Sequence, residues 1–278
     1  MFSVFHPPIN PVLGKGRVNG AMNPVPLQQS PEFARALAAY GADVAQTAPV
    51  VLRRALGPLG HIAFASRAHP QDVASTDIRL LNGETPCPEP YRALGFRQII
   101  TPVHIAEWNL CAPDLRAGLH GKWRNRLLKG EASGLRLRIA PWDGSAHWLL
   151  DRAQTMARAR KYRCYPTALL SAYAQLNPDR ALIIEAYDRG TPVAACLVLR
   201  HGVCATYHCA WSSATGHALN APRVVLWHAA THLAKRGHTI LDLGTVETDH
   251  APGLARFKLG TGATLRALGG TWVRLRAR

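Results

Sequence analysis

The sequence predicts a mixed α/β fold in which helices cover both faces of a central sheet. Short apolar runs typical of strands alternate with segments whose apolar residues recur at helical spacing. In the second half of the chain, three strand patterns with tight turns between them precede a helix and a further strand. Strands joined as hairpins that lead into a β-α-β crossover indicate a sheet with both antiparallel and parallel pairs.

The first part of the chain is expected to hold a small α/β unit. Residues 1–26 are rich in Pro, Gly and Asn and predict an irregular arm. Ser30 is a good N-cap and Pro31 suits the first helical turn, so a helix is expected from there to Gly41. Two strands are expected around the Gly57–Gly60 turn. The other elements expected here are a short helix over residues 70–81 and a strand over residues 96–100.

A long basic helix is expected next, from Pro113 to Ser133, with Gly134 ending it. The order of elements after it is strand, two helices, three strands, helix, strand, helix and two strands. Their expected ranges are 135–140, 146–162, 167–176, 181–187, 192–200, 203–211, 221–235, 239–244, 252–259, 264–268 and 271–275, the last two as a hairpin across Gly269 and Gly270.

The charge balance predicts an anionic partner. The chain has 33 basic and 17 acidic residues, a formal net charge of +16, and most of the basic residues are arginine. A field of this sign favours nucleic acid, acidic membrane surfaces, nucleotide-linked substrates or coenzyme A. A bias of genome composition toward alanine and arginine is the plain alternative. No apolar run is long enough to predict a membrane span, and the N-terminus lacks the pattern of a secretory signal.

The cysteines predict reduced thiols and no metal site. The six cysteines are scattered and form no C-x-x-C pair, which together with the lack of a signal pattern favours a cytoplasmic protein. His201, Cys204, His208 and Cys209 lie close together in sequence, but their spacing is not that of a zinc knuckle or ribbon. Buried cysteines that pack as small apolar residues are the expected reading.

Three stretches carry a family resemblance. They read LQQSPEFA at residues 27–34, HGKWRNRL at residues 120–127, and LDLG at residues 241–244 followed by APGLARFKLG at residues 251–260. They resemble the Fem-type (FemABX, peptidoglycan aminoacyltransferase-like) branch of the GNAT-fold acyltransferases. The resemblance implies an acyltransferase with tandem units: a partial GNAT-like unit at 27–112, a linking basic helix at 113–134 and a complete GNAT-like domain at 135–278.

The candidate site lies where the strands at 203–211 and 239–244 end, because ligands of α/β sheets bind at carboxyl ends of strands. By resemblance, Lys258 of the Phe257-Lys258 pair binds substrate and stabilises charge in the transfer step. The other candidate catalytic residues are Glu247, Asp249 and His208. The candidate substrate-binding residues are Phe257, Arg256, His250, Tyr207, Trp211, Lys122, Trp123, Arg124 and Asn125.

Several of these residues also have a purely structural explanation. The segment from Thr245 to His250 also fits a surface loop, and Phe257 fits a core position. Trp123 and Leu127 have the i, i+4 spacing of a buried helix face. In the transfer step, Lys258, Arg256 or backbone amides would meet the developing negative charge. Glu247, Asp249, His250 or His208 would accept the proton, and the sequence does not rank these four.

The expected donor is aminoacyl-tRNA, and no further cofactor is expected. Residues 212–223 lack the basic or glutamine residue and the second glycine of the turn that cradles the pyrophosphate of coenzyme A in many GNAT enzymes. The alternatives are an acyl-CoA-dependent N-acyltransferase of a small amine or lipid precursor, and a non-catalytic basic module that binds RNA. The chain has no room for the helical arm of the larger Fem-type enzymes, which disfavours a peptidoglycan acceptor.

Overall fold

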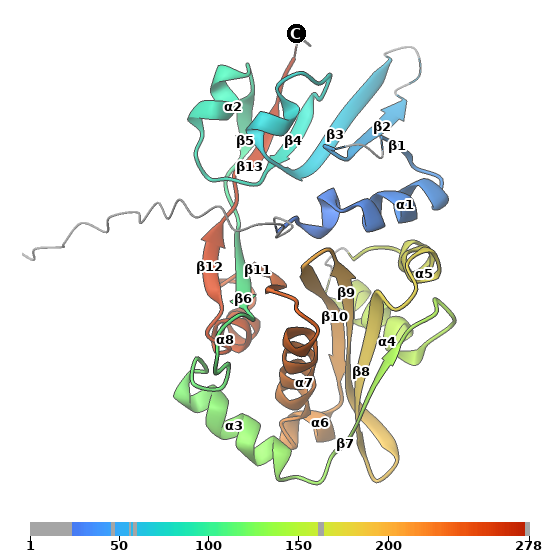
Figure 1. Ribbon diagram of the computed structural model, residues 1–278, viewed down its shortest axis with the longest axis vertical. Helices are drawn as coiled ribbons and strands as arrows, with labels where there is room; N and C mark the ends of the chain where they lie inside the picture. The colour runs from blue at the N-terminus through green and yellow to red at the C-terminus, as the bar shows by residue number, and fades with distance from the viewer. Residues whose placement is uncertain (1–23, 46–47, 56, 58–59, 161–163, 276–278) are drawn as a thin grey trace, which may run out of the picture.

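The computed structural model describes residues 24–45, 48–55, 57, 60–160 and 164–275. Its strands form two mixed sheets that lie at opposite ends of the molecule (Figure 1). The N-terminal sheet has the order β1-β2-β3-β4-β13-β5, and the C-terminal sheet has the order β12-β6-β11-β10-β9-β8-β7. The expected mixed α/β fold with tandem sheet units is therefore confirmed.

The strands of the N-terminal sheet are β1 (Asp43–Ala45), β2 (Val51–Ala55), β3 (His61–Ala68), β4 (Leu80–Gly83), β5 (Arg97–Ile100) and β13 (Gly270–Val273). Those of the C-terminal sheet are β6 (His104–Asn109), β7 (Arg136–Pro141), β8 (Ala181–Asp188), β9 (Thr191–His201), β10 (Cys204–Ser212), β11 (Ile240–Val246) and β12 (Thr264–Ala267). The helices are α1 (Pro31–Ala39), α2 (Glu89–Ala93), α3 (Gly121–Glu131), α4 (Trp148–Ala159), α5 (Thr167–Leu176), α6 (Ala214–Ala218), α7 (Ala221–Lys235) and α8 (Pro252–Leu259).

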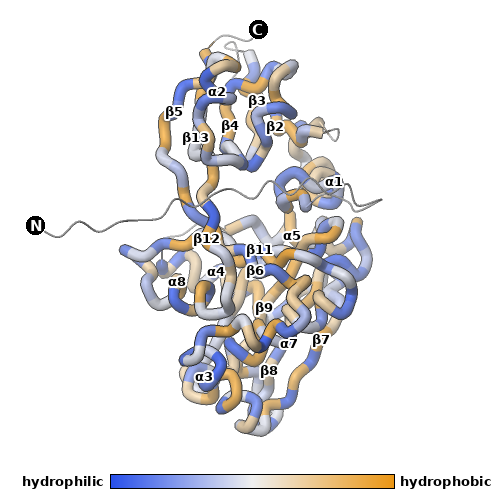
Figure 2. Tube along the Cα trace, turned by 60° about the vertical axis from the view of Figure 1, so that its left-hand side comes forward, coloured by the Kyte–Doolittle hydropathy of each residue, from blue (hydrophilic) through white to orange (hydrophobic). Residues whose placement is uncertain are grey.

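Helices cover both faces of the C-terminal sheet, as expected. On β8, Leu182 and Ile184 belong to the core beneath α3 and α7, whereas Ile183 belongs to the core beneath α1, α4 and α5. Alternate residues of a strand point to opposite faces, so a strand buried on both faces must be apolar throughout. The apolar stretches of β8 and β9 are visible in the hydropathy-coloured trace (Figure 2). No helix in the described part of the chain is long and apolar enough to cross a membrane.

The chain crosses twice between the two sheets. β5 belongs to the N-terminal sheet and the next strand, β6, to the C-terminal sheet, while β12 and β13 make the return crossing (Figure 1). The expected hairpin of residues 264–268 with 271–275 is therefore wrong. β12 pairs with β6, and β13 pairs with β4 and β5. Trp272 of β13 is buried against Tyr91, with ring centroids 4.9 Å apart, so burial in the other sheet overrides the local turn signal.

Two further expectations are corrected. The helix expected from Pro113 begins only at Gly121, because the Asp114 carboxylate accepts hydrogen bonds from the amides of Arg116 and Ala117 and forms a turn there. The helix expected over residues 70–81 is a short 3₁₀ helix, Pro70–Val73, followed by β4. By contrast, α5, α7 and α8 have the expected bounds. The division of the chain at residues 112 and 134 stays a prediction.

Candidate active site

The candidate site is formed where two neighbouring parallel strands separate. β10 and β11 pair over three residues each, from Cys204 with Ile240 to Thr206 with Asp242. Beyond this point β10 stays paired with β9, and β11 stays paired with β6. Both strands also shift register just past the separation, β10 between residues 207 and 209 and β11 between residues 242 and 245. A gap at the carboxyl ends of parallel strands is where α/β sheets bind ligands.

A cleft of about 750 Å³ occupies this gap. Its walls come from α4, the start of α5, β10, β11 and α8. The lining is mostly apolar, and its charged side chains are Arg160 and Lys258; none of the described lining residues is a carboxylate. The lining residues are Leu150, Ala153, Gln154, Met156, Arg160, Cys164, Tyr165, Thr167, Leu170, Tyr207, His208, Cys209, Ala210, Leu243, Gly244, Thr245, Leu254 and Lys258.

Lys258 is buried in the wall of the cleft. Its side chain leaves α8, only 7% of the residue is exposed, and its Nζ donates a hydrogen bond to the Thr245 carbonyl oxygen at 2.7 Å. That carbonyl belongs to the irregular part of β11, where Gly244 has a φ of +76°. Burial lowers the pKa of Lys258 to about 8, and the negative charges of Asp242 and Glu247 oppose the shift. The ammonium is therefore still the main form at neutral pH.

Helix α3 holds the helix that carries Lys258. The indole Nε1 of Trp123 donates to the Phe257 carbonyl oxygen at 3.0 Å, and the His120 amide donates to the Gly260 carbonyl oxygen at 3.0 Å. A Cβ added to Gly260 would lie 2.5 Å from Trp123 Cδ1, so only glycine lets the two segments approach this closely. The HGKWRNRL stretch thus contributes to the site by supporting α8.

His208 faces the cleft as a neutral ring. It stacks on Tyr165 with ring centroids 5.3 Å apart and an interplanar angle of 1°. Its Nε2 is buried without a hydrogen-bond partner among the described residues. Burial lowers the pKa of His208 to about 4 and raises the pKa of the neighbouring Tyr207 well above its usual value. The Tyr165 hydroxyl accepts a hydrogen bond from Gln28 Nε2 at 3.1 Å, which ties the LQQSPEFA stretch to the cleft.

The structure separates the other predicted site residues from the cleft lining. Glu247, Asp249, His250 and Arg256 are exposed around the turn between β11 and α8. Trp211 packs edge-on against Trp148 beneath Arg152.

The remaining predicted site residues lie on α3 and on the helix that packs against it, α8. Trp123 is buried in the core, and Phe257 packs against it at a centroid distance of 6.2 Å. Lys122 and Asn125 are exposed on α3, and Arg124 is partly exposed. Of the predicted site residues, Lys258, Tyr207 and His208 lie together in the cleft.

Several residues of the cleft were not among the sequence-based candidates. Gly244 and Thr245 form the irregular segment that contacts Lys258, and the LDLG motif contained the signal for the former. Tyr165 and the α4 residues Gln154 and Met156 line the opposite wall. Their positions depend on how α4 and α5 pack against β10, which no local pattern indicates.

The sequence matches the acetyltransferase (GNAT) domain family over residues 120–262, more than half of the chain. The protein therefore belongs to the GNAT acyltransferase family. A search of curated proteins finds no match.

Among solved structures, the chain is similar to FemX, with a TM-score of 0.70 and 10% identity over 88% of this chain and 93% of FemX. It is also similar to L-PGS from Bacillus licheniformis, with a TM-score of 0.54 and 12% identity over 91% of this chain and 94% of that one. A third similar structure is a C-terminal domain from Agrobacterium fabrum, provisionally named as part of a lysylphosphatidylglycerol synthetase. It has a TM-score of 0.61 and 14% identity over 90% of this chain and 89% of that domain. At these identities the likeness concerns the fold, which is of the FemX type.

Proposed function

We propose that this protein transfers an aminoacyl group from tRNA to an amine acceptor in the cleft beside Lys258. The observation that carries the proposal is the buried Lys258 ammonium at the point where β10 and β11 separate. A cation in a site shielded from water stabilises developing negative charge more strongly than it would in solvent.

The proposed step is aminolysis of an ester. The acceptor amine attacks the ester carbonyl, a C–N bond forms, and the carbonyl oxygen gains negative charge, which Lys258 stabilises. The C–O bond to the tRNA ribose then breaks, and the ribose oxygen takes up a proton. The attacking nitrogen loses its proton, and we assign its acceptor to His208, whose Nε2 has no hydrogen-bond partner in the described part of the chain. Glu247, Asp249 and His250 are less suited because they are exposed outside the cleft lining.

The start of α7 supports a donor other than coenzyme A. In a pyrophosphate-binding GNAT turn, free amides at a helix N-terminus face the ligand. Here the amide of Arg223 is already bonded to the Asn220 carbonyl oxygen at 3.0 Å, and Ala221 is fully buried. Helix α3 also packs closely on this turn, since a Cβ added to Gly130 would lie 2.6 Å from Val224 Cγ2. Little room is left for a pyrophosphate there.

The charge of the chain supports a polyanionic donor. The net charge is +16, and α3 exposes Lys122, Arg126 and Lys129. Phosphate contacts of exposed basic side chains are the main source of affinity for nucleic acid. The family name keeps acyl-CoA as the second candidate donor.

The test compares the donors directly. Purified protein is offered radiolabelled aminoacyl-tRNA and labelled acetyl-CoA in parallel, each with a panel of amine acceptors. We expect label to move from aminoacyl-tRNA, with loss of transfer in Lys258→Met and retention in Lys235→Met, a control at an exposed lysine of α7. Transfer from acetyl-CoA alone would show that the donor assignment is wrong. Tight tRNA binding with no transfer from either donor would instead favour a non-catalytic RNA-binding module.

A further inference from the structure

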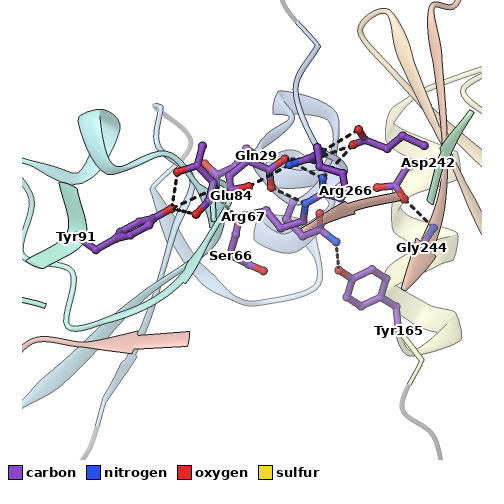
Figure 3. Close-up of polar contacts among 12 residues, drawn as sticks. Gln29, Ser66, Arg67, Glu84, Tyr91, Tyr165, Asp242, Gly244 and Arg266 are labelled. Carbon is purple, nitrogen blue, oxygen red and sulfur yellow. Dashed lines mark hydrogen bonds and ion pairs between the residues drawn. The ribbon is translucent and has the colours of Figure 1, made fainter. Parts of the chain in front are cut away.

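An ionic network of buried and partly buried side chains joins the two sheets (Figure 3). Arg67, at the end of β3, donates to both carboxylate oxygens of Glu84 at 2.8 and 2.9 Å, and also to Asp242 of β11. Arg266 of β12 binds both Glu84 and Glu107. The Arg67 and Asp242 side chains are 11% and 10% exposed, so this contact is shielded from solvent.

Asp242 connects this network to the cleft. One carboxylate oxygen, Oδ2, binds Arg67, while the other, Oδ1, accepts a hydrogen bond from the Gly244 amide at 2.7 Å. The second contact fixes the irregular segment at which β11 shifts register against β6. The same segment presents the Thr245 carbonyl oxygen to Lys258 Nζ. A continuous series of contacts therefore runs from Arg67 through Asp242 and the Gly244 segment to Lys258.

Arg67 and Asp242 each lie where a strand shifts register against its neighbour. Arg67 has a φ of +56° and is the extra residue where β3 shifts register against β4. A residue other than glycine in this region is strained, and such strain persists where surrounding contacts fix the conformation. Here those contacts are the carboxylates of Glu84 and Asp242.

The charges of the network complement Lys258. Two guanidiniums and three carboxylates leave one net negative charge, and Asp242, the carboxylate nearest the cleft, acts electrostatically on Lys258. Glu247 is the other carboxylate that acts on the charge of Lys258. The remaining titratable groups that line the cleft around it are Arg160, Cys164, Tyr165, Tyr207, His208 and Cys209.

We propose that Asp242, anchored by Arg67 from the N-terminal sheet, is the positioning residue of the acyl-transfer site: it fixes the Gly244 segment and keeps Lys258 in place as an ammonium. This assignment deepens the proposed function, since it gives the N-terminal sheet a part in organising the site. It is tested without substrate, so its outcome does not depend on the acyl-transfer assay.

The experiment measures the reactivity of the Lys258 amine in the full-length protein. Trace labelling with acetic anhydride is followed across pH 6 to 11 by mass spectrometry of the Lys258 peptide, with the exposed Lys122 as internal reference. Asp242→Asn removes the negative charge, but its side-chain oxygen can still accept from the Gly244 amide. We expect the labelling midpoint of Lys258 to move to lower pH by about one unit, because an opposite charge is lost. General loosening of the site would expose Lys258 and move the midpoint the other way.

The matched control is Glu107→Gln, which removes a carboxylate of the same network. Glu107 contacts Arg266 and, at 3.7 Å, Arg67, but it is not one of the two carboxylates that act on Lys258. It should leave the Lys258 midpoint unchanged. Should Asp242→Asn fail to fold, the double variant Arg67→Met/Asp242→Asn removes the pair as a unit and leaves no unpaired buried charge between them. An unchanged Lys258 midpoint in the folded Asp242 variant, a rise in it, or equal shifts in the Asp242 and Glu107 variants would overturn the proposal.

Discussion

The described residues contain one pair of parallel neighbouring strands in each sheet, and the two pairs differ in how they end. In the N-terminal sheet, β3 and β4 stay paired up to Ala68 and Gly83, where both strands stop. In the C-terminal sheet, β10 and β11 part after Thr206 and Asp242, although both strands continue. The cleft lies at the second pair. A parallel pair thus becomes a candidate ligand site where its partners separate before they end.

The difference arises from what the strands pair with next. β10 is held by β9 up to Ser212, and β11 is held by β6 up to Val246, so each strand follows a different neighbour. The Lys258 helix then packs against β11 at the gap. In the N-terminal sheet, Arg67 binds Glu84 across the end of the parallel pair, and both residues line a smaller cavity of about 220 Å³. The C-terminal sheet thereby provides the cleft, and the N-terminal sheet contributes Arg67 and Glu84 to the ionic network that reaches Asp242.

The largest expected effect comes from removing the Lys258 cation beside the point where β10 and β11 separate. Lys258→Met should lower the transfer rate by about 100-fold or more, since deleting one charge-stabilising group of this kind typically has that cost. The measurement is kcat with whichever donor supports transfer in the comparison proposed above, and Lys235→Met serves as the control. Full activity of Lys258→Met would exclude a catalytic role for Lys258.

The same substitution, Lys258→Met, should raise the free energy of unfolding at neutral pH although it lowers activity. The folded-state pKa of Lys258 is lowered from 10.5 to about 8, so burying the cation costs about 3 kcal/mol below pH 8. Between pH 8 and 10.5 the unfolded chain binds more protons, and the free energy of unfolding should rise with pH. Urea unfolding at pH 7 and pH 10 should show this rise reduced in Lys258→Met. An identical pH dependence in both proteins would contradict the lowered pKa.

Substitutions at two buried tryptophans should distinguish a loss of stability from a change in the geometry of the site. Trp123 donates its indole N–H to Phe257 at 3.0 Å, and Trp272 of the N-terminal sheet donates to Gly269 at 2.7 Å; both are buried. Trp→Phe at either position should cost about 1–3 kcal/mol for the unpaired carbonyl and the lost volume. Only Trp123→Phe should also lower activity, because it supports the Lys258 helix. Comparable activity losses in both variants would show that general destabilisation is the cause.

A pair of glycines tests the irregular segment of β11. Gly244 and Gly190 have φ values of +76° and +84°, and the latter lies in the β8–β9 turn with nothing near its Cβ position. Alanine at either should cost about 1 kcal/mol from backbone strain. Gly244→Ala should in addition alter Lys258 labelling, since the new Cβ would lie 3.7 Å from its Nζ. If Gly190→Ala altered it equally, the segment would have no special role.

The smallest expected effect concerns tRNA binding. Arg126→Gln on α3 should reduce the slope of log affinity against log salt by about 1, as expected for loss of one phosphate contact. Arg97→Gln on β5 removes an equally exposed charge from the N-terminal sheet and should leave the slope unchanged. Equal changes would indicate that binding is spread over both sheets. The readout is fluorescence anisotropy of labelled tRNA between 50 and 300 mM salt.

Local signals predicted helices α5, α7 and α8 well. α7 and α8 have Pro222 and Pro252 in their first turns and apolar residues at helical spacing, so their bounds followed directly. Lys258 was reached through its family resemblance and the rule on strand ends. The left-handed φ of Arg67 and the stacking of Tyr165 on His208 were not predicted, because both depend on contacts between residues distant in sequence.

The expected hairpin failed for the same reason. Gly269 and Gly270 carry a strong local turn signal. In the structure, however, they allow other segments of the chain to pack closely against their backbone. A Cβ on Gly269 would lie 2.4 Å from the Thr85 carbonyl oxygen. Pairing of β13 with β4 joins residues far apart in the chain, such as Thr271 and Asn82, which are 189 positions apart, and no local window of sequence contains both.

The strand crossings also set an order of events during synthesis. β13 lies between β4 and β5, so β5 cannot join the N-terminal sheet until residues 270–273 leave the ribosome. Strands made early must wait for one made late, whereas β6 is available to the C-terminal sheet before most of its partners are translated. Long-range pairing of this kind slows folding. The part of the protein that is synthesised first is therefore the part that is completed last.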